Sequence, residues 1–271
     1  MKVILTATVP VVQYGNLQPT VEVEADTYEE AMAQAEAHIT SFWNKHAENG
    51  KQLKGAQGKR LKAFVGGDIN YDDATHIYTN DAGDVYLSGS QYAKQFEKEF
   101  NKEAVAGKMA EKWGVSGPDV IAMWELKSQV SMGFGTALHG ALELFGKYRG
   151  LAKDIEKETH LHDHPILKDA VEGFYASRMQ EKAVYEALVV DHAKKRAGRI
   201  DRLLITGANR CRVQDYKTNS VMDKDKLDYY WKQLSFYADI LKSGGWVVEG
   251  LDIFHWNGKW TSYSGEVQEC R

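Results

Sequence analysis

The sequence predicts an α/β fold in which a mixed central sheet is flanked by helices. From residue 183 onward, the stretches AVYEALVVD, GRIDRLLI and CRVQDYK alternate apolar and polar side chains with a period of two, which is typical of half-buried strands. Short connections between them predict an antiparallel meander. Helices are predicted before and after the meander, at 135–149 and 225–242, and further strands at 246–254 and 259–263.

The N-terminal part predicts a small ββα region. Residues 2–12 and 19–25 alternate as strands do, with turn residues between them. Thr27 and Glu30 then have the spacing of a capping box, in which each side chain bonds the other residue's backbone amide. We therefore expect a helix to begin here and to reach about residue 46.

Residues 49–60 are rich in Gly and Lys and almost without apolar side chains, which predicts a linker. We therefore expect two parts, an N-terminal region with its linker at 1–60 and a larger domain at 61–271. Before the first strand of the meander, the sequence also predicts a hairpin at 76–87 and helices at 90–113 and 118–132.

Composition excludes several classes of protein. No apolar run approaches the ~20 residues that span a bilayer, and the N-terminus lacks the cleavage site of a signal peptide. We expect a cytoplasmic protein with no membrane association. Two cysteines, Cys211 and Cys270, cannot supply a zinc or iron–sulfur site alone. The absence of a Gly-x-x-x-x-Gly-Lys-[Ser/Thr] phosphate loop predicts no ATP hydrolysis.

A local basic band lies on a chain of net charge −4. The stretch 192–217 holds eight Lys and Arg residues against two Asp. Such a band suits DNA held at one face of the protein, whereas the alternative is a solvated hairpin. The residues that we predict to contact DNA from this band are Lys194, Lys195, Arg199 and Arg202.

Two carboxylates in the meander predict a metal site. If the hairpin between the second and third strands turns around Ala208, Asp201 and Asp215 lie directly opposite each other. Two like charges in this arrangement destabilise a sheet, whereas a divalent cation bound between them reverses the effect. Lys217, two residues after Asp215, projects from the same face of its strand. A register shift of one residue would remove this argument.

The neighbouring polar residues suggest supporting roles. His139 and Glu143 share a helix face with Gly135. His139 is either a metal ligand or a phosphate contact, and Glu143 is either structural or functional. Glu186, in the first strand, either holds the metal through water or accepts a proton from the nucleophile. The Lys217 ammonium is placed to orient a water molecule or to stabilise transition-state charge.

Five motifs in order resemble the RecB-like branch of the PD-(D/E)XK nuclease superfamily. They are Gly-x-x-x-His-x-x-x-Glu, a strand Glu, Gly-x-x-Asp, Asp-x-Lys and Gln-x-x-x-Tyr, within a motif core at 135–260. The resemblance implies that His139, Asp201, Asp215 and the Tyr216 carbonyl bind the metal. It also implies a catalytic Lys217, with Gln233 and Tyr237 contacting the DNA strand or supporting the site.

The same resemblance implies a magnesium- or manganese-dependent DNA nuclease in which a metal-activated water leaves 5′-phosphate and 3′-hydroxyl ends. An exonuclease of the phage or mobile-element type, acting in recombination or repair, is the first choice. Many relatives carry four cysteines for an iron–sulfur cluster, and this chain departs from that pattern. The alternatives are a structure- or site-specific endonuclease and a non-catalytic DNA-binding or scaffolding protein. The N-terminal region is left with three roles: oligomerisation, DNA binding, or recruitment of a partner such as a single-strand annealing or recombination protein.

Overall fold

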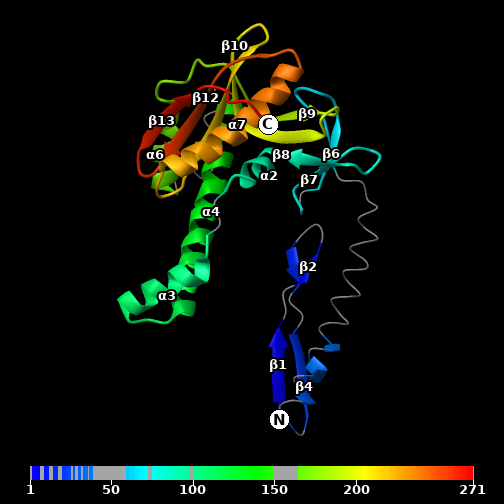
Figure 1. Ribbon diagram of the computed structural model, residues 1–271, viewed down its shortest axis with the longest axis vertical. Helices are drawn as coiled ribbons and strands as arrows, with labels where there is room; N and C mark the ends of the chain where they lie inside the picture. Colours follow the sequence, from blue (N-terminus) through cyan, green and yellow to red (C-terminus); the bar gives the residue numbers. More distant parts are fainter. Residues whose placement is uncertain are drawn as a thin grey trace. The chain divides into compact units, whose positions relative to one another are not determined.

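The computed structural model describes residues 59–72, 75–97, 100–148 and 164–270, together with parts of 2–38 (Figure 1). The chain divides into two compact units, one of residues 1–61 and 69–83 and the other of residues 62–68 and 84–271. Among the described residues, no helix combines the length and the apolar character needed to cross a membrane.

The first unit contains short antiparallel strands. β1 (Lys2–Thr6) pairs with β4 (Thr20–Glu24), and a small hairpin of β2 (Val9–Val11) and β3 (Gly15–Leu17) lies between them in the chain. The predicted strand 2–12 is therefore two strands. The predicted capping box is confirmed, because the Thr27 amide donates to Glu30 and the Glu30 amide donates to the Thr27 hydroxyl.

A second antiparallel group in this unit consists of β5 (Lys59–Leu61), β6 (Ile69–Asp72) and β7 (Ile77–Thr79). The predicted linker at 49–60 falls mostly outside the described residues. Its last two residues belong to β5, where they pair with β6, so the prediction of a linker is wrong for them.

The second unit is built on a mixed sheet. The predicted meander is confirmed: β9 (Ala183–Asp191), β10 (Arg196–Gly207) and β11 (Arg210–Lys217) are successive antiparallel neighbours. The helix α7 (Lys224–Ser243) then leads to β12 (Val247–Trp256), which is parallel to β11 and antiparallel to β13 (Trp260–Gly265). A short parallel strand, β8 (Val85–Ser88), pairs with the start of β10.

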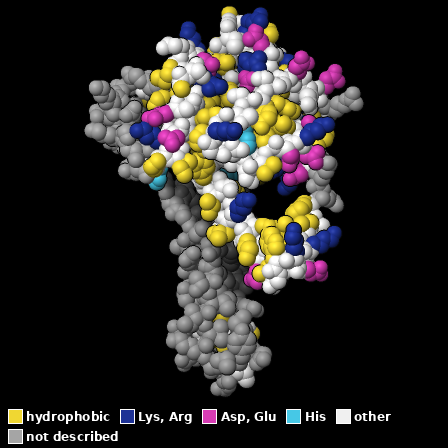
Figure 2. All heavy atoms as spheres, turned by 90° about the vertical axis from the view of Figure 1, so that its left-hand side faces the viewer, with side chains coloured by type: hydrophobic (Ala, Val, Ile, Leu, Met, Phe, Trp, Pro, Cys, Tyr) yellow, Lys and Arg dark blue, Asp and Glu magenta, His cyan; other side chains and the backbone are white. Residues whose placement is uncertain are grey.

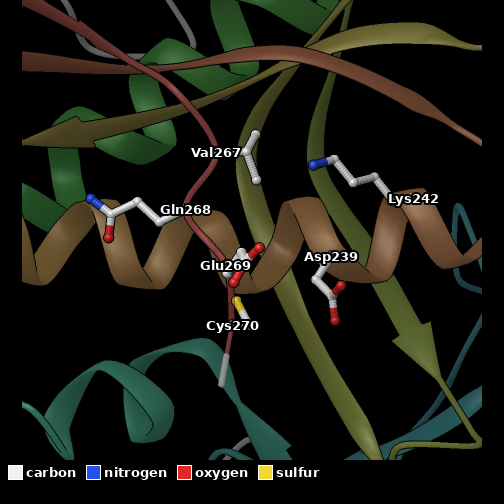
Figure 3. Close-up of a pocket in the computed structure, with 6 residues that line it drawn as sticks. All are labelled: Asp239, Lys242, Val267, Gln268, Glu269 and Cys270. Carbon is white, nitrogen blue, oxygen red and sulfur yellow. The ribbon is translucent and has the colours of Figure 1, made fainter.

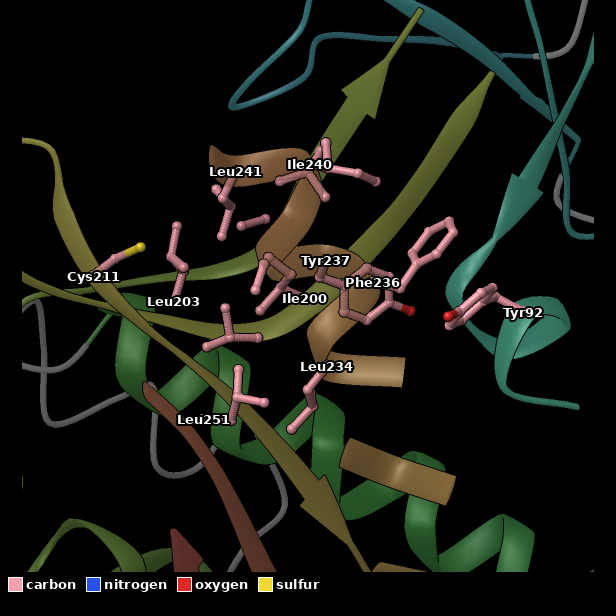
Figure 4. Packing of buried hydrophobic residues seen from close by; sticks show 14 of the residues in the cluster. Tyr92, Ile200, Leu203, Cys211, Leu234, Phe236, Tyr237, Ile240, Leu241 and Leu251 are labelled. Atoms are coloured by element: carbon pink, nitrogen blue, oxygen red, sulfur yellow. The ribbon is translucent and has the colours of Figure 1, made fainter. Parts of the chain in front are cut away.

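Helices cover both faces of this sheet, and each face has its own apolar core. Against one face lies α7, which buries Leu234, Phe236, Ile240 and Leu241 against residues of β10, β11 and β12 (Figure 4). Against the other face lie α4 (Gly117–Tyr148) and α6 (Pro165–Tyr175), around an aromatic cluster that includes Phe174, Tyr216 and Phe254. The predicted α/β architecture, a mixed sheet flanked by helices, is confirmed.

The helices before the sheet differ from the prediction. α4 is one continuous helix of 32 residues, where the sequence predicted an interruption between 132 and 135. Glycines there cost only about 1 kcal/mol each in a helix, and no proline follows Pro118 within it. The predicted helix 90–113 is instead two helices, α2 (Gly89–Lys94) and α3 (Lys102–Trp113), because Asn101 caps a new start.

Candidate active site

Three carboxylates form a row across β9, β10 and β11. The β10–β11 register pairs Arg202 with Gln214. One residue further along both strands, Asp201 therefore lies opposite Asp215. On the other edge of β10, the register with β9 places Glu186 opposite Asp201. The row concentrates negative charge, and carboxylates that lie directly opposite each other in a sheet repel and destabilise it.

The predicted β10–β11 register is confirmed. The pairs Leu204 with Arg212 and Ile205 with Cys211 are centred on residue 208, as the hairpin hypothesis required. A register shift occurs only between Ile205 and Gly207, close to the turn. It therefore leaves the pairing near the carboxylates unchanged.

Lys217 lies beside Asp215 as the strand period predicts, and the two side chains form an ion pair. The Asp215 Oδ2 atom is buried and, apart from this pair, has no hydrogen-bond partner among the described residues. Burial raises the pKa of Asp215, Lys217 opposes that shift, and Asp201 adds to it. The same ion pair raises the pKa of the Lys217 ammonium against the effect of its own burial, so this lysine is held in its charged form.

Tyr230 is a site residue that the sequence motifs did not identify. The Lys217 Nζ atom lies 4.6 Å from the centroid of the Tyr230 ring, within cation–π range. Tyr230 is separated by three and seven residues from Gln233 and Tyr237, which places all three on one face of α7. That spacing is the signal that would have found it.

Asp201 is held by α4 and by the neighbouring strand. The Tyr216 amide donates to Asp201 Oδ2 over 2.9 Å, and His139 Nδ1 lies 3.3 Å from the same oxygen. The Asp201 side chain is 18% exposed and that of His139 is 31% exposed, so both reach solvent. The structure therefore brings together His139, Asp201 and the Tyr216 amide, while metal binding by the Tyr216 carbonyl stays a prediction.

Glu186 has an unusual backbone conformation and a raised pKa. Its φ of 50° lies in the left-handed region, which costs a non-glycine residue roughly 1–2 kcal/mol. Desolvation by burial, then Asp201 and Glu143, raise its pKa to about 7, against the smaller opposing effects of Arg199 and Lys147. The Arg199 guanidinium lies 4.0 Å from it. Strain and raised pKa together are typical of a functional carboxyl group.

The pKa of Glu186 predicts how the stability of the metal-free protein depends on pH. A carboxyl group that holds its proton more tightly when folded stabilises the fold at low pH, and that contribution is lost as pH rises from about 4.5 to about 7. Glu186→Gln should lack this loss. Urea unfolding in chelator from pH 4.5 to 8 measures it, and a constant stability difference between the two proteins across this range would contradict the assignment.

Tyr237 is buried and packs against two glycines of neighbouring elements. Its side chain is 6% exposed and packs against Gly198 and Gly89, where a Cβ atom would lie within 2.5 Å of the ring. Both positions therefore require glycine. Gln233 Nε2 lies 3.4 Å from the Tyr237 hydroxyl. Of the two predicted roles for Tyr237, this burial favours support of the site over contact with DNA.

The predicted basic band is neutralised within the protein. All eight Lys and Arg residues of 192–217 form ion pairs with carboxylates: Lys194 and Arg196 with Asp239, Lys195 with Asp84, Arg199 with Glu186, Arg202 with Glu181, Arg210 with Glu249, Arg212 with Asp252 and Lys217 with Asp215. Figure 2 shows basic and acidic side chains interspersed on the face that it presents. This stretch is therefore not a uniformly positive surface.

Two residues of the predicted DNA contacts are placed differently from expectation. Arg202 is fully buried, beneath the aromatic cluster, so its guanidinium does not reach solvent where DNA would bind. Lys194 is directed to Asp239 on α7, at 2.8 Å. Arg202 therefore belongs to the interior of the sheet, and its prediction as a DNA contact is wrong.

A pocket elsewhere on this unit is separate from the carboxylate row. It is lined by Asp239 and Lys242 of α7 and by the C-terminal segment Val267, Gln268, Glu269 and Cys270 (Figure 3). None of the candidate catalytic residues lines it. We therefore assign it no part in the chemistry.

The donor atoms of the row fit a hard divalent cation. Among the described residues, no three His, Cys, Asp or Glu side chains are already grouped as a metal site. Two of the carboxylates have other partners instead, since Asp215 pairs with Lys217 and Asp201 accepts from the Tyr216 amide. Oxygen donors with repelling charges, one of them without a hydrogen bond apart from its ion pair with Lys217, are nonetheless the chemistry that magnesium and manganese prefer.

Comparison with known families agrees with this arrangement. A family model described as the PD-(D/E)XK nuclease superfamily matches residues 122–259, which is just over half of the chain. The chain belongs to the PD-(D/E)XK nuclease superfamily. Membership implies a hydrolase of phosphodiester bonds that acts on DNA, and nucleases of this superfamily typically use divalent metals. No curated protein matches the chain.

Proposed function

We propose that the protein is a RecB-like, magnesium- or manganese-dependent DNA exonuclease of the phage or mobile-element type, acting in recombination or repair. The observation that carries the proposal is the row of Glu186, Asp201 and Asp215 with Lys217 beside its last member. Three carboxylates on adjacent strands, with Asp215 buried among them, destabilise the protein unless a cation uses them. A catalytic role therefore explains a costly arrangement that a scaffolding protein would not need.

We propose that Asp201, Asp215 and the Tyr216 carbonyl hold the cation, with His139 as a further ligand. When bound, the cation supplies Lewis acidity that polarises the phosphodiester and activates a water molecule. His139 lies against Asp201 and limits the orientations that this carboxylate adopts. Glu143 pairs with Lys147 on α4 and, from outside the row, raises the pKa of Glu186.

Lys217 and Glu186 have separate roles in the reaction. The charged Lys217 ammonium donates to the phosphoryl oxygens and stabilises the negative charge that grows in the transition state. Glu186 accepts the proton of the attacking water, because its carboxylate lies next to the proposed metal ligand Asp201 in the row and reaches solvent. The proton then leaves through solvent, since the Glu186 side chain is 34% exposed.

Residues 61–271 are the proposed nuclease domain, and residues 1–60 have an accessory role. Oligomerisation, DNA binding and recruitment of an annealing protein are the three candidates for that role. Deleting residues 1–58 and measuring oligomeric state, DNA affinity and cleavage rate in parallel separates them. We expect the full-length protein to hydrolyse DNA phosphodiesters and to leave 5′-phosphate and 3′-hydroxyl ends.

Digestion of three DNA topologies tests the proposal. We expect end-labelled linear duplex to be degraded with magnesium or manganese and not with chelator, while closed circular single- and double-stranded DNA stay intact. The control is Glu172→Gln, which removes an exposed carboxylate of α6 that belongs neither to the row nor to the partners of the basic band, and it should cleave as the unmodified protein does. Asp215→Ala should be inactive on every substrate.

Each result has a distinct meaning. Cutting of closed circles would move the assignment to an endonuclease of the same fold. DNA binding without cleavage in either metal would favour the scaffolding function. Cleavage that survives Asp215→Ala would place the active site elsewhere and overturn the proposal.

A further inference from the structure

A second row of polar side chains crosses the sheet one residue away from the carboxylates. It runs from Arg202 of β10 through Gln214 of β11 and Asp252 of β12 to Ser264 of β13, each opposite the next in the strand register. The first two members are the direct neighbours of Asp201 and Asp215 in the sequence. Neither the family resemblance nor the proposed chemistry uses this row.

Hydrogen bonds join the side chains of this row into one network. Arg202 Nη1 donates to Gln214 Oε1, and Gln214 Nε2 donates to Asp252 Oδ2 over 2.9 Å. The Ser264 hydroxyl donates to Asp252 Oδ1 over 2.8 Å, which closes the chain at β13. At the other end, Arg202 Nη2 donates to Glu181 over 2.7 Å. The strands from β10 to β13 are thus linked through side chains as well as through their backbones.

Three members of this row, Arg202, Gln214 and Asp252, are buried, where unpaired polar groups cost stability. Arg202 is 0% exposed, Gln214 3% and Asp252 6%. The Arg202 guanidinium lies over the rings of Phe174 and Tyr185, at 5.6 and 5.9 Å from their centroids. A buried ionic network is often no more stabilising than apolar residues of the same volume, and its best-documented use is to specify a register.

The position of the link between Arg202 and Gln214 indicates which register it specifies. This pair is the last one in the β10–β11 ladder before the strands reach the carboxylates. Beyond it, Asp201 and Asp215 repel each other, and this repulsion opposes the pairing of the two strands when no metal is bound. A slip of one residue would place Arg202 opposite Val213 or Asp215 and would leave the Gln214 Oε1 atom without its donor.

We propose that the link between Arg202 and Gln214 is a positioning device that holds Asp201 opposite Asp215, so that both carboxylates reach one divalent cation. The inference rests on the proposed metal-dependent function. Neither residue touches the metal or the substrate. Their effect passes through the backbone to the neighbouring carboxylates.

Two variants and their combination test the link. Arg202→Met and Gln214→Leu each remove it, and the double variant replaces both partners by apolar side chains, which avoids a buried unsatisfied group. Arg212→Met is the matched control, because Arg212 also bonds Asp252 but does not join β10 to β11. The measurements are Mn²⁺ affinity by electron paramagnetic resonance, urea unfolding, and hydrogen exchange of the Tyr216 amide, which donates to Asp201.

We expect each single variant to bind Mn²⁺ at least ten-fold more weakly than the control, and the double variant no more weakly than the worse single one. The Tyr216 amide should exchange at least ten-fold faster in all three, while the double variant keeps a urea midpoint near that of the unmodified protein. A double variant with unchanged Mn²⁺ affinity and unchanged Tyr216 exchange would overturn the inference, and so would equal effects in Arg212→Met.

The amide readout needs no metal, so failure of the proposed function remains distinguishable. If the unmodified protein neither binds Mn²⁺ nor cleaves DNA, the proposed function fails. Faster Tyr216 exchange in the variants would still support the positioning role in that case. If Arg202→Met does not fold, Gln214→Leu, which removes no charge, carries the test alone.

Discussion

Replacing Lys217 by methionine should slow DNA cleavage by roughly 10²–10³-fold, the usual loss when one preorganised donor to a transition-state charge is removed. Methionine keeps the unbranched apolar stem of the side chain and removes the ammonium that lies over the Tyr230 ring. The metal should bind at least as tightly as before, because Asp215 no longer shares its charge with the ammonium. Single-turnover cleavage at saturating manganese measures the chemical step directly.

Lys259→Met is the control for this experiment, since it removes an exposed lysine from the turn between β12 and β13. We expect it to cleave at the rate of the unmodified protein. A Lys217→Met variant that cleaves within three-fold of that rate would exclude Lys217 from the reaction. Loss of metal binding in the variant would show instead that the lysine is structural.

Asp201→Asn should abolish the stabilisation that metal gives to the fold. A ligand at a hundred times its dissociation constant stabilises a protein by about 2.7 kcal/mol. For a chain of this size, that corresponds to a rise of roughly 5–10 °C in the melting temperature. Differential scanning calorimetry with manganese and with chelator should show the rise in the unmodified protein and not in the variant.

The same substitution should leave the metal-free protein at least as stable as before. Asparagine keeps an oxygen to accept from the Tyr216 amide, and it removes the repulsion with Glu186 and Asp215. Asp239→Asn, far from the row, should keep the full response to manganese. A response that also survives Asp201→Asn would mean that the cation binds elsewhere.

The sequence predicted the carboxylate site because its geometry is local. The distance from Asp201 to Asp215 along the chain is set by one hairpin, and the turn near residue 208 fixes which residues face each other. The Asp215–Lys217 contact follows from strand periodicity alone. Likewise the capping box at Thr27 needs only a spacing of three residues.

The ion pairs of the basic band were not predictable in the same way. Asp239, Glu249 and Asp252 lie on α7 and β12, some 40 residues from the arginines and lysines that they neutralise. No periodicity within 192–217 indicates these partners. The burial of Arg202 escaped prediction for the same reason, because Phe174 reaches it from a helix that precedes the meander. Only the folded topology brings such groups together.

The neutralised band has a consequence for how this protein meets DNA. Basic proteins usually gain affinity for any duplex by displacing condensed counterions, and the gain grows with each free lysine or arginine. Here the lysines and arginines of residues 192–217 are already paired with the protein's own carboxylates. A DNA phosphate that binds to one of them replaces a carboxylate as its partner. That replacement displaces few counterions and therefore gains little entropy, so this stretch adds little sequence-independent affinity for duplex DNA. Affinity for a duplex through counterion release then has to come from lysines and arginines outside residues 192–217.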